Sequence, residues 1–202
     1  MEKKEKREGI RLYCMSFVCL TDKGGFVVKK LIMLFLTILL SISLFAANEL
    51  INGQLDGELQ KFVNRSGNFE LYWKVLENDE LYFAIRAKTT GWVAVGFDPS
   101  FMMKDADIKI ANIVDGVVTI EDHYGNSATG HRQDDQKEIV EYAGSEQDGW
   151  TFVEWIMPLD SGNPGDKPVK IGQKNKVIIA FSSSTDSLWR KHSFRETVEP
   201  VM

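Results

Sequence analysis

Apolar and polar residues alternate along most of the chain beyond residue 57, and this period of two predicts β-strands. The segment 69–76 (FELYWKVL) places its large apolar residues on one face, and 80–87 (ELYFAIRA) repeats the alternation after a turn at 77–79. These two segments predict a hairpin. Further strands are predicted at 106–114, 117–124, 138–143, 150–157 and 177–184.

The segment 92–97 (WVAVGF) differs because it is apolar on both faces and small at Ala94 and Gly96. This pattern predicts a central strand that is covered on both sides, or one whose second face meets a ligand. No amphipathic helix of useful length is evident. Eight or nine short strands at regular spacing predict an all-β fold, namely a single-domain, Greek-key, antiparallel β-sandwich of immunoglobulin-like architecture.

The N-terminal 47 residues do not fit this strand pattern. Residues 28–47 combine Lys29 and Lys30, an apolar run at 31–45 and two alanines, which is typical of a secretory signal peptide. As a helix, that run would extend only about 22 Å, short of a bilayer core of about 30 Å, so we expect no stable membrane span after cleavage. We interpret 1–27 as a leader whose start codon is misassigned, 48–57 as a lead-in and 58–202 as the exported domain, periplasmic or extracellular.

Composition narrows the chemistry of the exported part. Both cysteines, Cys14 and Cys19, lie in the leader, so residues 48–202 hold no thiolate for iron–sulfur clusters or covalent haem. Those residues carry 16 basic and 25 acidic side chains, and such a surface repels nucleic acid. We find no nucleophile motif, phosphate loop or distinctive carboxylate pair, and therefore expect a binding or electron-transfer domain rather than an enzyme.

Several short motifs follow one another in a recognisable order and together resemble a DOMON domain. They are GWVAVGFDPS (91–100), MKDAD (103–107), VDG (114–116), D-x-Y-x-x-x-A-T-G-H (122–131), PLD (158–160) and FSSSTDSLWRKHSFR (181–195). The resemblance covers almost the whole exported part and implies an immunoglobulin-like β-sandwich, in agreement with the strand count.

The resemblance also implies a ligand. Haem-binding members of the family hold b-type haem non-covalently through a methionine and a histidine, which correspond here to Met103 and His192. Met102 stands beside Met103 and is the alternative ligand, while Lys191 and Ser193 depart from the family pattern around the histidine. Apolar walls for such a haem are expected from aromatic residues: Trp92, Phe97, Phe101, Trp189 and Phe194.

Met/His ligation of haem b implies electron transfer with a separate, unknown redox partner protein. The alternative is a carbohydrate- or other small-ligand-binding module that stacks sugars on Trp150, Trp155 or Tyr142, and a third reading is an interaction domain without a ligand. His123 and His131, with acidic residues nearby, leave open a metal site of imidazole and carboxylate ligands.

Overall fold

The computed structural model describes residues 50–135 and 138–202. The predicted leader and signal peptide lie outside the described residues. Among the residues that are described, no helix has the length and apolar character needed to cross a bilayer. The part of the predicted lead-in that is described, residues 50–57, contains no strand.

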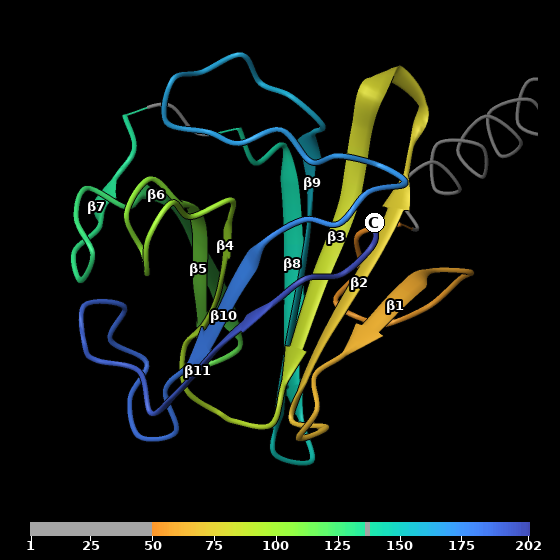
Figure 1. The fold of residues 1–202 in the computed structure, drawn as a ribbon. Coiled ribbons are helices and arrows are strands. Elements are labelled where there is room, and N and C mark those ends of the chain that lie inside the picture. Colours follow the sequence, from red (N-terminus) through yellow and green to blue (C-terminus); the bar gives the residue numbers. More distant parts are fainter. Residues whose placement is uncertain (1–49, 136–137) are drawn as a thin grey trace, which may run out of the picture. The chain divides into compact units, whose positions relative to one another are not determined.

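Two antiparallel sheets pack face to face and form a sandwich (Figure 1). One sheet has the order β1 (Gln60–Val63), β2 (Phe69–Val75), β3 (Glu80–Ala87), β9 (Trp150–Pro158), β8 (Glu141–Gln147). The other has the order β11 (Phe194–Val198), β10 (Val177–Phe181), β4 (Val93–Phe97), β5 (Asp107–Val114), β6 (Val117–Tyr124), β7 (Arg132–Gln133). The predicted all-β sandwich is confirmed.

The core lies between the sheets because alternate residues of both point inward. Phe69, Leu71 and Trp73 are buried on β2, as the alternation in the sequence predicts. Phe83 of β3 joins the two layers, with its ring 5.3 Å from Phe97 of β4 and 5.2 Å from Trp155 of β9. Full burial of each such side chain contributes about 1.5–3 kcal/mol, so this aromatic group is a major part of the stability.

Most predicted strands match the structure closely, and the differences fall at strand ends and at the sheet edges. The predicted 138–143 strand lies instead at 141–147 as β8, and the predicted 177–184 strand ends at Phe181. Three strands were not predicted: β1, β7 and β11. All three are edge strands of two to five residues with largely exposed side chains, so their sequences carry little alternation.

The central strand β4 is covered on both faces, as predicted from its sequence. Val93, Val95 and Phe97 point into the core, while Trp92 and Ala94 pack on the opposite side against Leu188 and Ile110. β4 begins beside Phe181, where the chain leaves β10, and ends where the loop that contains Met103 begins. The side of the six-stranded sheet that faces away from the core is called the outer face below.

Candidate functional site

The outer face is apolar over its central strands, although it does not belong to the core between the sheets. Strand pairing places side chains of β10, β4 and β5 side by side there. Ile108 and Ile110 are almost completely buried. A side chain at Gly96 would crowd the side chains of Ile178 and Ile108 and force them to shift, so glycine allows these isoleucines to approach the strand. The apolar residues of this face are Ala94, Ile108, Ile110, Ile178 and Ala180.

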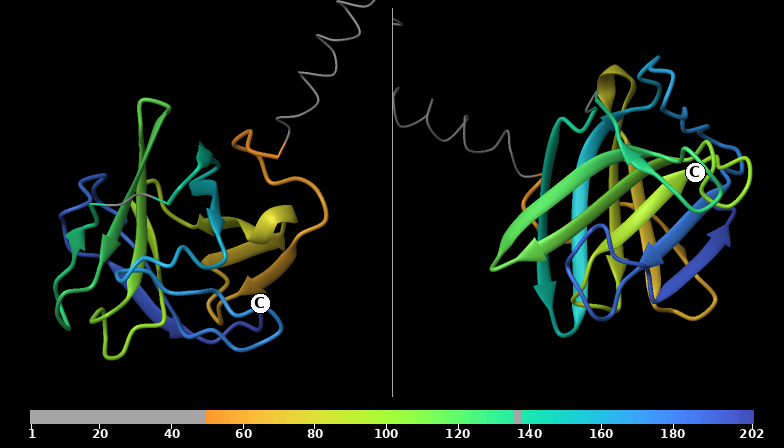
Figure 2. Two further views of the ribbon diagram at one scale, coloured as in Figure 1. Left: turned by 90° about the horizontal axis from the view of Figure 1, so that it is seen from above. Right: turned by 90° about the vertical axis from the view of Figure 1, so that its left-hand side faces the viewer.

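The chain between β10 and β11 covers this face. We call residues 182–192 the crossing segment. The Asn112 side-chain amide donates a hydrogen bond of 2.6 Å to the Asp186 carbonyl, and Leu188 packs on Trp92 and Ile110. The right-hand view of Figure 2 looks onto the six-stranded sheet, with the crossing segment in blue in front of it.

The contact between the crossing segment and the outer face leaves polar atoms without hydrogen-bond partners. Within the described residues, four buried side-chain atoms lack a hydrogen-bond partner, and three of them lie here: Trp92 Nε1, Asn112 Oδ1 and Asp186 Oδ1. Each such atom costs about 1–3 kcal/mol. The crossing segment is therefore bound less tightly to the outer face than it would be if these atoms were hydrogen-bonded.

Met103 lies in the loop between β4 and β5, at the end of the sheet where β6 finishes. Its N–H donates to the Ala128 carbonyl at 3.3 Å, and its carbonyl accepts from the Ala106 N–H at 3.1 Å. A side chain at Gly125 would overlap the Met103 carbonyl, so glycine is what allows the two loops to meet. Met103 is half-buried, and the preceding Met102 adopts a left-handed backbone conformation with φ of 55°.

His192 lies at the return of the crossing segment to the sheet. The next residue, Ser193, donates its N–H to the Phe181 carbonyl at 2.9 Å. Burial, with the charges of Arg195 and Lys191, lowers the pKa of His192, so its imidazole is neutral and able to bind a metal at neutral pH. Met103 follows the Phe97 end of β4 in the chain, whereas His192 comes two residues before β11, at the end of the sheet where Phe181 pairs with Val93. These two ends of β4 are about 13 Å apart at about 3.3 Å per residue.

The predicted aromatic walls lie in three different environments. Trp92 is buried on the outer face beneath Leu188, whereas Phe101 and Trp189 are exposed by 63% and 65%. The expectation for Phe97 and Phe194 was wrong. Phe97 belongs to the core between the sheets, and Phe194 stacks on Phe181 and packs against that core. Both residues occupy strand positions whose side chains point toward the core and away from the outer face.

A histidine pair lies beside Trp189, near the Met103 loop. His123 of β6 is fully buried, and its Nδ1 is 2.8 Å from Nδ1 of His131, while its Nε2 is 2.8 Å from a Glu121 carboxylate oxygen. Trp189 is stacked parallel to His131 with ring centroids 6.1 Å apart. Burial and the neighbouring His123 lower the pKa of His131.

The structure also contains a buried charge cluster that sequence reasoning missed. The Lys109 ammonium is 2.6 Å from carboxylate oxygens of both Asp107 and Asp122, and 3.8 Å from Glu138. Asp107 and Lys109 are buried because β5 turns this side of the strand toward the core. The charged residues within an otherwise apolar strand, DIKI, were the available signal.

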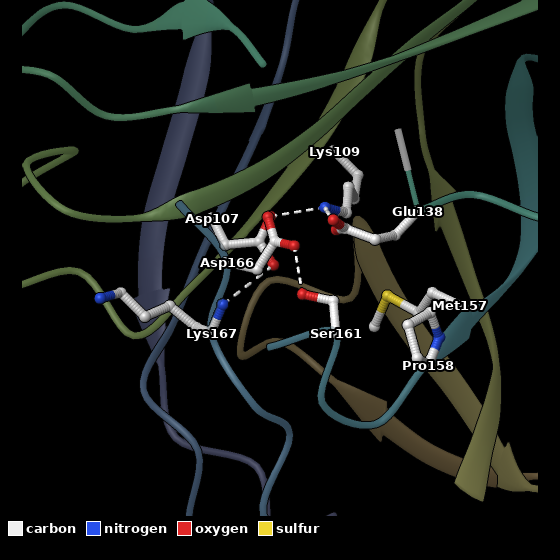
Figure 3. A pocket seen from close by; sticks show the side chains of 8 residues that line it. All are labelled: Asp107, Lys109, Glu138, Met157, Pro158, Ser161, Asp166 and Lys167. Atoms are coloured by element: carbon white, nitrogen blue, oxygen red, sulfur yellow. Dashed lines mark hydrogen bonds and ion pairs between the residues drawn. The ribbon is translucent and has the colours of Figure 1, made fainter. Parts of the chain in front are cut away.

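The cluster holds more negative than positive charge, which affects its protonation. Asp166 joins it from the connection between β9 and β10, beside a small pocket (Figure 3). Burial raises the pKa of Asp107 to about 6 despite the nearby Lys109. Burial and a hydrogen bond with Asp166 raise the pKa of Glu138 to about 8. Lys109 is the cation of this site, and we interpret the cluster as structural.

The aromatic residues considered for sugar stacking do not form a common surface. The prediction that Trp155 stacks on a sugar was wrong, because Trp155 is completely buried in the core. Trp150 is half-buried, and the Arg86 guanidinium lies 4.2 Å from its ring centre. Tyr142 is 38% exposed.

Solved structures share this fold. The cytochrome b domain of pyranose dehydrogenase from Coprinopsis cinerea matches with a TM-score of 0.53 and 12% identity, over 70% of this chain and 81% of that one. The cytochrome domain of cellobiose dehydrogenase from Myriococcum thermophilum matches with a TM-score of 0.55 and 8% identity, over 75% and 88%. At these identities the likeness concerns the fold alone.

Curated relatives match over part of their length. The human "DBH-like monooxygenase protein 1" is 26% identical over 108 residues, 53% of this chain. The mouse protein of the same name is 28% identical over 102 residues, 50% of this chain. The matches span only 17% and 16% of those proteins. The family model for the DOMON domain matches residues 65–182, more than half of the chain. This chain therefore belongs to the DOMON domain family.

Proposed function

We propose that this exported domain binds b-type haem non-covalently, with Met103 and His192 as axial ligands, and acts in electron transfer. The observation that carries the proposal is the apolar outer face, with Met103 in the loop after the Phe97 end of β4 and His192 before β11 at the Phe181–Val93 end of the same sheet. The cytochrome domains that share this fold provide the motive for choosing haem.

The residues of the outer face fit a flat apolar group. The small residues Ala94 and Gly96 leave room above the centre of the outer face, and Ile108 and Ile110 make that surface apolar. Leu188 of the crossing segment packs on these residues, so haem binding requires the segment to move outward. Three unpaired polar atoms, two beneath the segment and Asp186 Oδ1 within it, make that movement less costly, because lifting the segment exposes them to water.

Each ligand residue has a defined task. Met103 offers a thioether from a loop whose backbone is fixed to Ala128 and Gly125. His192 offers a neutral imidazole from the end of the crossing segment, so movement of the segment and delivery of the ligand are coupled. A haem held by Met103 and His192 would supply one-electron transfer and would leave no position for oxygen.

A haemin titration of the purified domain tests the proposal. We expect one equivalent to bind and to give a sharp α-band after reduction. Met103→Ala and His192→Ala should each weaken binding at least tenfold and abolish the band. Met102→Ala and His131→Asn are matched controls that should retain it. Unchanged spectra in Met103→Ala or His192→Ala would contradict the assignment of the ligands.

The same proposal states where the domain acts and with what kind of partner. The domain acts outside the cytoplasm, after removal of the segment 28–47, and exchanges electrons with a separate protein rather than performing catalysis itself. N-terminal sequencing of the exported protein tests the first statement, which predicts a start near residue 48. A mature chain that retains the apolar run 31–45 would contradict it.

A further inference from the structure

The histidine pair on the outer face has the geometry of a metal chelate. Nδ1 of His123 and Nδ1 of His131 face each other at 2.8 Å, from β6 and from the loop that follows it. We propose that these two nitrogens bind a Cu²⁺ ion, at a site separate from the haem ligands Met103 and His192.

The protonation of His123 prepares its Nδ1 as a ligand. A carboxylate only accepts hydrogen bonds, so Nε2 of His123 must donate to Glu121 at 2.8 Å. In the neutral ring, Nδ1 then presents a lone pair toward His131. An imidazole whose second nitrogen donates to a carboxylate is the usual outer arrangement of metal-binding histidine in proteins.

Without a metal, the contact is a hydrogen bond in which His131 Nδ1–H donates to His123. Binding requires only that the His131 proton moves from Nδ1 to Nε2, which leaves the ring neutral and directs a second lone pair at the ion. No other proton is lost. Each ring has to rotate so that its Nδ1 lone pair turns from the other nitrogen toward the ion, while the two nitrogens stay close together. His131 is half-buried, so water can reach the ion and fill the remaining positions.

The distance between the nitrogens favours copper. With metal–nitrogen bonds of about 2.0–2.1 Å, a nitrogen separation of 2.8 Å corresponds to an angle of about 90° at the metal. That angle is typical of square-planar or tetragonal Cu²⁺, whereas tetrahedral Zn²⁺ needs an angle of about 109° and a wider separation. The general order of metal affinities also places Cu²⁺ above Zn²⁺.

Trp189 provides a reporter for the site. Its ring centre lies 5.4 Å from that of His123 and 6.1 Å from that of His131, and it is stacked parallel to the latter. A paramagnetic ion between the two histidines would therefore quench Trp189 fluorescence efficiently. Trp189→Phe should remove most of the Cu²⁺-dependent change while leaving the affinity for Cu²⁺ unchanged within about threefold.

The test uses haem-free protein and CuCl₂, so that its outcome is independent of haem binding. We expect one equivalent to bind at micromolar concentration or below and to give an electron paramagnetic resonance spectrum with coupling to two imidazole nitrogens. His131→Asn, at a half-buried position where folding should survive, should weaken binding at least tenfold. Glu121→Gln should weaken it about tenfold through the loss of the outer carboxylate.

His192→Ala is the matched histidine control and should bind Cu²⁺ as the unmodified protein does. A circular dichroism spectrum of each variant confirms that it is folded. Binding that is unaffected by His131→Asn, or a spectrum without two-nitrogen coupling, would overturn the proposal. Loss of Cu²⁺ binding in His192→Ala would overturn the separation of the two sites.

Discussion

The Asn112 side chain fastens the crossing segment to the outer face through a 2.6 Å hydrogen bond to the Asp186 carbonyl. The other side-chain atom of the same amide, Oδ1, is buried without a partner. The stabilisation from the Asn112 hydrogen bond is therefore partly offset by the desolvation of Oδ1. In the proposed haem complex the crossing segment leaves its present position, so this hydrogen bond would oppose binding.

Asn112→Val removes that restraint while keeping a strand-forming side chain of similar size. One lost hydrogen bond of about 0.5–1.5 kcal/mol should favour the open segment and tighten haemin binding by about twofold to tenfold. The affinity from a haemin titration is the measurement. Thr119→Val, on the exposed part of the neighbouring strand, is the control and should leave affinity unchanged. Weaker binding in Asn112→Val would show that the segment stays closed over a bound haem.

The Lys109 ammonium neutralises the buried carboxylates of Asp107 and Asp122. Lys109→Met keeps the length of the side chain but leaves Asp107 and Asp122 buried without their cation. We expect a loss of about 3–5 kcal/mol in the free energy of unfolding, measured with urea. The triple variant Lys109→Met with Asp107→Asn and Asp122→Asn should recover part of it, because no unpaired charge remains. A triple variant that is less stable than Lys109→Met would contradict this account.

Glu138 makes stability depend on pH. Its pKa rises from 4.5 to about 8 on folding, so the folded protein takes up a proton that the unfolded chain has lost at neutral pH. The stabilisation is complete below pH 4.5 and is lost as the pH rises through 8. Asp107, with a pKa of about 6, acts in the same direction over a lower range.

We therefore expect the free energy of unfolding to fall between pH 5 and pH 8 by an amount on the order of 2 kcal/mol. Glu138→Gln, which mimics the protonated carboxyl, should flatten this dependence, whereas the exposed Glu58→Gln should not. Urea unfolding at several pH values measures it. Stability that increases with pH in the unmodified protein would contradict the inferred protonation of the cluster.

Glu154 attaches the described start of the domain to the five-stranded sheet. Its carboxylate is completely buried and accepts hydrogen bonds from the N–H groups of Asn52 and Gly53 at 2.7 and 2.6 Å, and from the Tyr82 hydroxyl at 2.6 Å. Glu154→Ala leaves these donors without a partner and should cost about 2–4 kcal/mol. It should also accelerate hydrogen exchange at Asn52 and Gly53. Exchange at these two amides that remains slow would contradict the role of Glu154.

Sequence reasoning found the sandwich because its inner strands carry the alternation, as in Phe69, Leu71 and Trp73. It missed β7 and β11, which lie at a sheet edge and bury little. It also misplaced Phe97, since alternation divides residues between two faces without telling which face meets a ligand. The charged residues of DIKI were a local signal for the Lys109 cluster, but its partners, like the contact between His123 and His131, depend on strand register and loop geometry that lie beyond any local pattern.

The most direct test of the central claim is the coordination of iron in the haemin-reconstituted domain, measured by X-ray absorption at the iron edge. Ligation by Met103 and His192 predicts one sulfur and five nitrogen neighbours in the unmodified protein, and loss of the sulfur in Met103→Ala but not in Met102→Ala. An iron with no sulfur neighbour, or a sulfur neighbour that persists in Met103→Ala, would contradict the claim that Met103 is an axial ligand.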